Sequence, residues 1–144
     1  MAMIRPAELA DVKLVLTIAE AQARRLPSLR PDASKMRALA IDCISSAQNF
    51  AWVSEDGGQV TGVLFAMSYE ILWAERKGVS ALLWYSDSKG EGMAMLREFA
   101  RWVRSRRAVK MADFSPMCDW DSRIDNLLIR AGFSRSGGSF ILFQ

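Results

Sequence analysis

The chain has 144 residues, carries a formal net charge of +3 at pH 7 and contains no histidine. The length suits one domain with one core, and a hydrophobic content of 51% supplies enough apolar material to fill it. The lack of histidine excludes histidine-ligated zinc sites, Ser-His-Asp triads and Cys-His dyads, so acid–base chemistry must come from carboxylates, Tyr, Cys, Lys or water.

The charge, the cysteines and the hydropathy indicate which ligands and which cellular compartment to expect. A mild positive charge suits an anionic small ligand, although a solvated basic face accounts for it equally well, and it is too small to indicate a nucleic-acid partner. Cys43 and Cys118 lie far apart, as is typical of reduced thiols in the cytoplasm. No apolar run approaches the roughly 20 residues of a membrane span, and the first residues lack the layout of a secretory signal. We therefore expect a cytoplasmic protein without membrane or metal partners.

The first half of the chain predicts a strand, two helices and a hairpin. Pro6 can begin the first helix because its missing N–H is not needed there, and Asp32 or Ser34 can cap the second. Glu55-Asp56-Gly57-Gly58 is a strong turn signal between two strands, and residues 68–73 fit either strand or loop. The expected elements are a strand at 3–5, a helix from 6 to about 25, a helix from about 33 to 46, and strands at 50–53 and 60–67.

The second half predicts a buried strand and two amphipathic helices. Residues 79–85 are apolar on both faces, which favours a central strand. Apolar spacing predicts a helix from Met93 to Arg107, and Gly132 is suited to end the last one. The remaining elements are a loop at 86–92, a strand at 111–115, a helix at about 121–131, and a closing hairpin of 133–135 with 140–143. The resulting order, β-α-α-β-β-β-α-β-α-β-β, predicts one α/β (α+β) domain over residues 1–144 with a mixed sheet.

The stretch Asp87-Ser88-Lys89-Gly90-Glu91-Gly92, between a strand and a helix, carries the clearest chemical signal. Glycines let backbone N–H groups approach an anion, and a helix N-terminus adds free donors and partial positive charge. Such a segment can hold a phosphate. Two glycines at this spacing are also common in a simple turn, so that interpretation stays open.

Three segments in order resemble the GNAT (Gcn5-related N-acetyltransferase) family over nearly the whole chain. They are the opening Ile4-Arg5-Pro6-Ala7 with Leu9-Ala10-Asp11-Val12, then Gly90-x-Gly92 followed by Met93-Ala94-Met95-Leu96, and finally Leu127-Leu128-Ile129-Arg130-Ala131-Gly132-Phe133. The resemblance implies a mostly antiparallel twisted sheet, splayed at a cofactor cleft and flanked by about four helices. Residues 83–85 and the small size are also similar to GNAT-like proteins of bacteriophages.

The same resemblance implies acetyl-CoA as the cofactor and assigns residues to it. Pantetheine would lie beside the strand before the loop, completing the sheet by strand addition, and a backbone amide would bind the acetyl carbonyl as an oxyanion donor. Backbone groups of Trp84, Tyr85 and Ser86 would face pantetheine, and the N–H groups of Lys89, Gly90, Glu91, Gly92 and Met93 would bind the pyrophosphate.

The chain departs from the family pattern at several positions. Asp87 stands where the family's loop begins with Arg or Gln, and the usual proline at the end of the preceding strand is missing. Leu128 occupies the position of the tyrosine that often protonates the departing thiolate, and Asp121 that of an asparagine. The register of the binding amides is therefore open by one or two residues.

Acetyl transfer to an amine needs a base for the amine and a proton for the thiolate. Asp113 could be the base, or simply a solvated carboxylate at a strand edge. Tyr85 could donate the proton, or be a packed strand aromatic. Cys118 is a further proton donor if it is not a quiet buried thiol.

Two functions lead, and an unrelated α/β domain stays open as a third interpretation. The first is an acetyl-CoA-dependent N-acetyltransferase that transfers the acetyl group directly to an amine of a small molecule or protein. The alternative is a GNAT-like binding or structural protein, phage-derived, that has lost catalysis. The apolar run 140–143 could pair across a homodimer.

Overall fold

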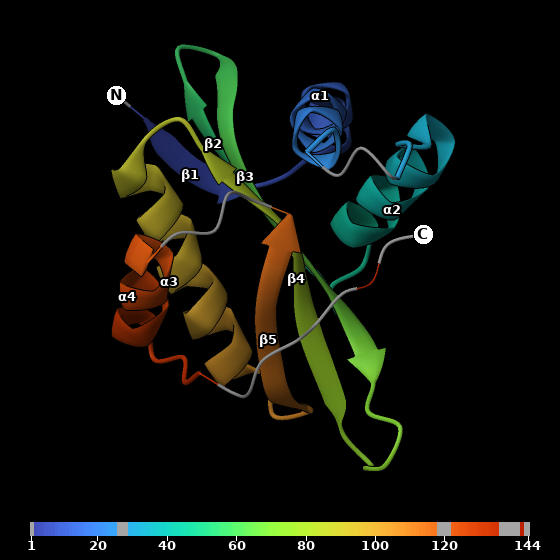
Figure 1. Ribbon diagram of the computed structural model, residues 1–144, viewed down its shortest axis with the longest axis vertical. Helices are drawn as coiled ribbons and strands as arrows, with labels where there is room; N and C mark the ends of the chain where they lie inside the picture. The colour runs from blue at the N-terminus through green and yellow to red at the C-terminus, as the bar shows by residue number, and fades with distance from the viewer. Residues whose placement is uncertain (1, 26–28, 118–121, 136–141, 143–144) are drawn as a thin grey trace.

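The computed structural model describes residues 2–25, 29–117, 122–135 and 142, and Figure 1 shows how their helices and strands are arranged. The elements in chain order are β1 (Met3–Pro6), the 3-10 turn η1 (Leu9–Asp11), α1 (Val12–Ala23), α2 (Ala33–Ser45), β2 (Phe50–Asp56), β3 (Gln59–Glu70), β4 (Lys77–Ser86), α3 (Lys89–Ser105), β5 (Val109–Met117) and α4 (Ser122–Ala131). Through α4 this is the order that the sequence predicts.

The strands form one mixed sheet in the order β1-β2-β3-β4-β5. Neighbours are antiparallel except β4 and β5, which run parallel and are joined by α3. A parallel pair needs such a crossover because its strands start at the same edge of the sheet. The prediction that β4 is an inner strand is confirmed, since it pairs with a neighbour on each side.

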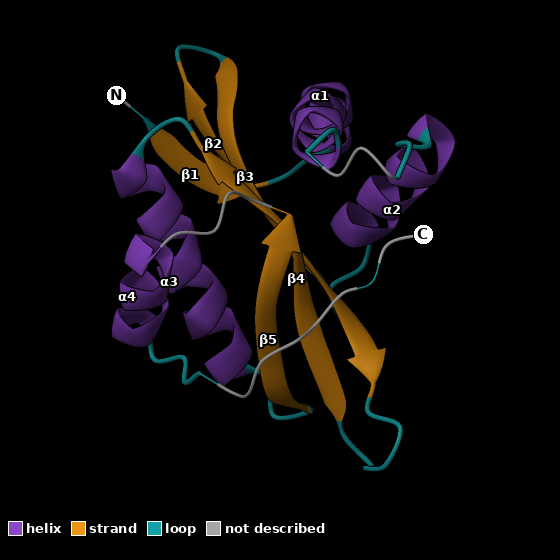
Figure 2. Ribbon diagram, in the orientation of Figure 1, coloured by secondary structure: helices purple, strands orange, loops and turns teal. Residues whose placement is uncertain are grey.

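Helices cover both faces of this sheet, with α1 and α2 on one face and α3 and α4 on the other (Figure 2). The side chains of each strand therefore alternate between two apolar clusters. Leu64, Val79 and Trp84 belong to the cluster under α3 and α4, whereas Val63, Phe65 and Leu83 belong to the cluster under α1 and α2. No helix among the described residues is long and apolar enough to span a bilayer.

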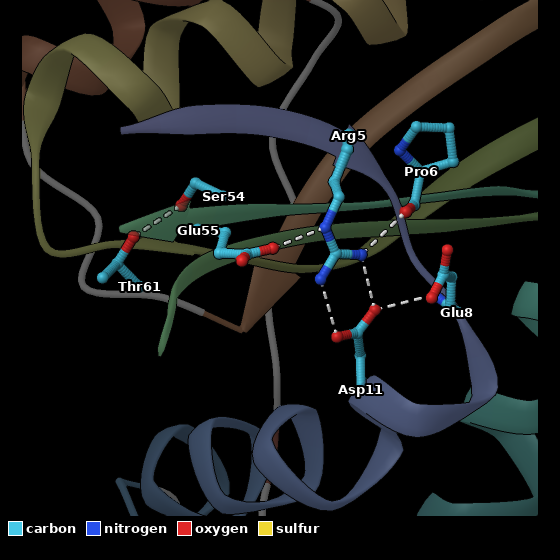
Figure 3. A network of polar contacts seen from close by, with 7 residues as sticks. All are labelled: Arg5, Pro6, Glu8, Asp11, Ser54, Glu55 and Thr61. Atoms are coloured by element: carbon cyan, nitrogen blue, oxygen red, sulfur yellow. Dashed lines mark hydrogen bonds and ion pairs between the residues drawn. The ribbon is translucent and has the colours of Figure 1, made fainter. Parts of the chain in front are cut away.

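A network around Arg5 fixes the start of the chain to the sheet (Figure 3). The Arg5 guanidinium donates to both carboxylate oxygens of Asp11, at 2.8 and 2.9 Å, and to Glu55 on β2 at 2.7 Å. Asp11 also accepts the Glu8 N–H at 2.7 Å. This contact caps a 3-10 turn, so the α-helix begins at Val12 rather than near Pro6, which corrects the predicted boundary.

Three other boundaries are settled by packing and caps. Asp32 caps α2 by accepting the Lys35 N–H at 3.1 Å, as predicted, and the ambiguous residues from 68 to 70 continue β3. Gly132 ends α4 with a φ of +102°.

The predicted strand at 133–135 is wrong: these residues form no strand among the described ones, and the Phe133 ring instead packs on Phe99 and Phe114. Residues 140, 141 and 143 of its predicted partner lie outside the described residues.

Candidate functional site

The turn from β4 into α3 is tighter than the sequence analysis predicts. The helix begins at Lys89 instead of Met93, because Ser88 is its N-cap and accepts the Glu91 N–H at 3.5 Å. Ser86 Oγ in turn accepts the Ser88 N–H at 3.1 Å and donates to the Ser88 carbonyl. The predicted loop at 86–92 is thus a short turn plus the first turn of a helix. The spacing Ser88-x-x-Glu91, a capping-box signature, is the sequence signal that marks this start.

Two backbone amides of this first turn remain available for a ligand. The Gly92 N–H donates to the Ser88 carbonyl at 3.1 Å, and the Glu91 N–H faces the Ser88 hydroxyl. The N–H groups of Lys89 and Gly90 have no acceptor within the described part of the chain. Among the described residues, a Cβ at Gly90 would meet only Ser88 Oγ, at 3.8 Å, so none of them closes this side of the turn. The predicted anion cradle therefore reduces to two amides at the positive end of α3.

Gly92 has a different role from Gly90. Trp84 Nε1 donates to the Gly92 carbonyl at 3.2 Å, and a Cβ at position 92 would lie 3.1 Å from Ser86 Cβ. The glycine therefore permits close contact between α3 and β4. The Trp84 indole is buried in the cluster under α3, so only its backbone remains for a ligand. Met93 follows as a half-buried helical residue packed against the same cluster.

Both carboxylates near this turn accept a hydrogen bond from a hydroxyl group. The Tyr85 hydroxyl donates to Asp87 at 2.6 Å, and the Thr61 hydroxyl donates to Glu91 at 3.0 Å. The hydrogen bond to Asp87, together with desolvation, raises the pKa of Tyr85 above its ordinary value. Asp87, which departs from the family pattern, is thereby held by its own strand, and its charge does not point freely at the two amides.

A β-bulge at Leu82 is a feature that the sequence analysis missed. Phe65 and Ala66 of β3 pair with Leu83 and Ala81 of β4, so Leu82 is an extra residue that has no partner on β3. On the other side of β4, Ala81 pairs with Phe114 and Leu83 pairs with Met117. Over this step β5 therefore advances by three residues while β4 advances by two. No side-chain signal marks such a bulge, because it arises from the register of two neighbouring strands. Its consequence is that Leu82 has no cross-strand partner in either described ladder of β4.

Beyond the bulge, β4 loses its second neighbour. The last described pair between β4 and β5 is Leu83 with Met117, whereas Trp84, Tyr85 and Ser86 continue to pair with β3. Within the described residues, these three therefore have no ladder partner on the β5 side. An apolar cavity of about 90 Å³ adjoins the bulge between α1, α2 and the sheet, and Leu82 and Leu83 form part of its wall.

Asp113 lies on β5 directly across from Ser80 and is held by two hydroxyl groups. Ser80 Oγ donates to one carboxylate oxygen at 2.7 Å, and the Tyr69 hydroxyl donates to the other at 3.0 Å. Burial, followed by the bond to Asp113, raises the pKa of Tyr69. Because Ala112 and Phe114 pack against the cluster under α3, Asp113 points to the opposite face, the one that carries α1 and α2.

The structure does not bring the two predicted catalytic side chains together. Tyr85 faces the same side of the sheet as Asp113 but lies five residues beyond Ser80, or about 16 Å along the strand. Leu82 is closer to Asp113, only about 7 Å along β4 from Ser80. Leu128, at the family's tyrosine position, is a buried core residue. Cys118 and Asp121 lie outside the described residues.

Comparison with known proteins places this arrangement among acetyltransferase structures. A possible acetyltransferase from Clostridium difficile 630 matches with a TM-score of 0.73 and 9% identity, over 100% of this chain and 97% of that one. A GCN5-related N-acetyltransferase from Ralstonia eutropha JMP134 matches with a TM-score of 0.70 and 20% identity, over 99% and 98%. A predicted acetyltransferase from Clostridium acetobutylicum, solved with acetyl-CoA, matches with a TM-score of 0.70 and 15% identity, over 99% and 96%. This chain has the GNAT fold.

The match to the GNAT fold is one of structure and not of sequence. No protein-family model and no curated protein matches the chain. The five-stranded mixed sheet with two helical layers is the architecture that the sequence resemblance implies. The chemistry of this GNAT-fold chain must therefore be argued from its own residues.

Proposed function

We propose that this chain is an acetyl-CoA-dependent N-acetyltransferase that transfers the acetyl group directly to an amine. One observation carries the proposal. The N–H groups of Lys89 and Gly90, at the positive end of α3, have no acceptor among the described residues, and β4 has there passed beyond its last described pair with β5. A diphosphate fits these donors, since Asp87 and Glu91 are held by the hydroxyls of Tyr85 and Thr61.

The backbone of β4 would receive the rest of the cofactor, which supplies an activated thioester when bound. The edge of Trp84, Tyr85 and Ser86 that has no partner among the described residues can hydrogen-bond an amide-bearing chain by strand addition. We assign the Leu82 N–H as the donor for the developing negative charge on a carbonyl oxygen, because Leu82 has no cross-strand partner in either described ladder. This places the reacting centre two to four residues before the segment that the sequence analysis assigned.

Asp113 would prepare the acceptor. An ammonium group must lose a proton before its nitrogen can attack, and a carboxylate within reach, directly or through one water, can take that proton. Ser80 and Tyr69 fix the orientation of Asp113 on the α1/α2 face, about 7 Å along the sheet from the bulge. The apolar cavity next to Leu82 suits an acceptor that carries a short apolar group beside its amine.

The main alternative is a GNAT-fold protein that binds a cofactor without turnover. Leu128 favours it, because a buried leucine replaces the hydroxyl expected to protonate the thiolate. The proton of the Tyr85 hydroxyl is directed at Asp87, so this side chain does not replace it in the arrangement described.

A thermal-shift measurement with acetyl-CoA and CoA tests binding. Both should raise the melting temperature, because a ligand that binds the folded state stabilises it by mass action. Gly90→Trp fills the open side of the first turn and should abolish the shift, whereas Gly90→Ala, the matched control, should retain it. A wild-type protein that shifts with neither ligand would contradict the proposal.

Thiol release across a panel of primary amines separates the two functions. Turnover that exceeds hydrolysis with at least one amine supports the enzyme. Ligand-induced stabilisation without turnover on small amines and on lysine-bearing or N-terminal peptides supports the binding protein.

A further inference from the structure

A groove rich in arginine lies between α3 and α4, the two helices that run side by side on one face of the sheet (Figure 1). Its volume is about 410 Å³, within the range of small-ligand sites. Small residues form part of its surface, and the other four lining residues are arginines. The lining residues are Arg97, Ala100, Arg101 and Arg104 of α3 with Arg130, Ala131 and Gly132 at the end of α4.

The positive charge of this groove is only partly balanced. Arg101 forms an ion pair with Glu98, and Arg104 donates to the Ala131 carbonyl at 3.1 Å, where it stabilises the end of α4. Arg97 and Arg130 have no hydrogen-bond or ion-pair partner in the described part of the chain. Within the described part of the chain, the four arginines therefore have one carboxylate partner, Glu98. Helix packing does not require this, because α3 contacts the sheet through its opposite face, with Leu96 and Phe99.

The groove is separate from the proposed cofactor site. Arg97 is eight residues and Arg104 fifteen residues after Lys89, which places them about 12 and 22 Å along the helix from its first residue. The groove therefore extends from the middle of α3 to its C-terminal end, whereas the proposed cofactor site lies at its first turn.

We propose that the arginine groove binds a di- or triphosphate group of a small molecule. Guanidinium groups bind phosphate and carboxylate oxygens with paired hydrogen bonds, and every charged residue lining this groove is Arg rather than Lys. A phosphate carries between one and two negative charges, so two or three linked phosphates match the excess of guanidinium charge within one small volume. A peptide would have to place several carboxylates in the same space. The inference does not depend on acetyl transfer and would stand for an inactive protein.

Calorimetric titration of the wild type and of Gly90→Trp, in which the first turn of α3 is filled, with inorganic triphosphate tests the proposal. We expect saturable binding that persists in Gly90→Trp. The double variant Arg97→Gln/Arg130→Gln should weaken it by about tenfold or more, since hydrogen bonds to charged groups are lost. Arg30→Gln/Arg37→Gln is the matched control: both arginines are exposed and lie outside the groove, and the net charge falls equally.

Three results would overturn the proposal. The first is equal weakening in the groove variant and the control, which would indicate general charge attraction. The second is loss of triphosphate binding in Gly90→Trp, which would place the anion at the start of α3. The third is tighter binding of a single-stranded oligonucleotide than of triphosphate, lost in the groove variant, which would identify a nucleic-acid surface instead.

Discussion

The indole Nε1 of Trp84 donates a hydrogen bond to the carbonyl oxygen of Gly92, and the two atoms are 3.2 Å apart. This bond joins the end of β4 to the start of α3 inside the apolar cluster. It gives different structural roles to two glycines that look equivalent in the sequence. Gly92 permits a helix to pack closely on a strand, whereas Gly90 leaves an open side where a ligand can approach.

The two glycines should respond oppositely to alanine. Gly90→Ala should raise the free energy of unfolding by about 0.5–1 kcal/mol, because alanine favours the helix and its Cβ meets no close neighbour. Gly92→Ala should lower it by about 1 kcal/mol or more, since the new Cβ crowds Ser86 Cβ at 3.1 Å. Urea denaturation measures both. Equal stabilisation by the two changes would contradict the packing role of Gly92.

The Arg5–Asp11 pair should make the free energy of unfolding depend on pH in the acid range. The hydrogen bond from Arg5 lowers the pKa of Asp11 below its ordinary value of 3.8. A carboxyl group with a depressed folded pKa contributes stability above its unfolded pKa and loses that contribution as the pH falls through the folded value. Asp11→Asn should therefore cost about 2–3 kcal/mol at pH 7, with a difference from wild type that shrinks below about pH 4. Denaturation curves between pH 2.5 and 7 measure it, and a difference independent of pH would contradict the assignment.

The sequence predicts those parts of the fold whose signals are local. The apolar run of β4 indicates an inner strand. Asp32 marks the start of α2 because it accepts a hydrogen bond from a residue only three positions later in the chain. The start of α3 was also marked locally, by Ser88 and Glu91, but the glycines suggested a longer loop. Caps and buried strands are predictable because the interacting groups are close in the chain.

The candidate site depends on contacts between distant segments. The Leu82 bulge follows from pairing with β3 and β5, and Asp113 receives its hydroxyl partners from residues 33 and 44 positions earlier. No pattern within one segment of the sequence indicates that these distant residues lie in contact. The arginine groove similarly appears only when the ends of α3 and α4 pack together.

Cys43 should be an inert thiol. It is buried, donates to the carbonyl oxygens of Phe50 and Ala66 at 3.3 Å each, and burial raises its pKa to about 12. In a Cys118→Ser background, a thiol reagent at pH 8 should react only when the chain unfolds, because the thiolate is the reactive species. Since the folded pKa is the higher one, the contribution of Cys43 to stability is complete below its ordinary pKa of 9.0 and declines as the pH rises towards 12. Rapid labelling of the native protein at pH 8 would show that the thiol is accessible.

Asp113 and Tyr85 are both predicted as catalytic, and their isosteric variants should distinguish them. Asp113→Asn keeps an acceptor for one of its two hydroxyl partners but removes the basic carboxylate, so kcat for amine acetylation should fall by about 10²–10⁴. Tyr85→Phe should change kcat little, because the Tyr85 hydroxyl is bonded to Asp87 and lies away from the bulge. The thermal shift with acetyl-CoA should be retained in Asp113→Asn and reduced in Tyr85→Phe, which releases Asp87 beside the two amides. The melting temperature without ligand serves as the control for folding in both variants. If Tyr85→Phe abolishes turnover while Asp113→Asn remains active, the reacting centre lies at the end of β4, as the sequence alone suggested, and not at Leu82.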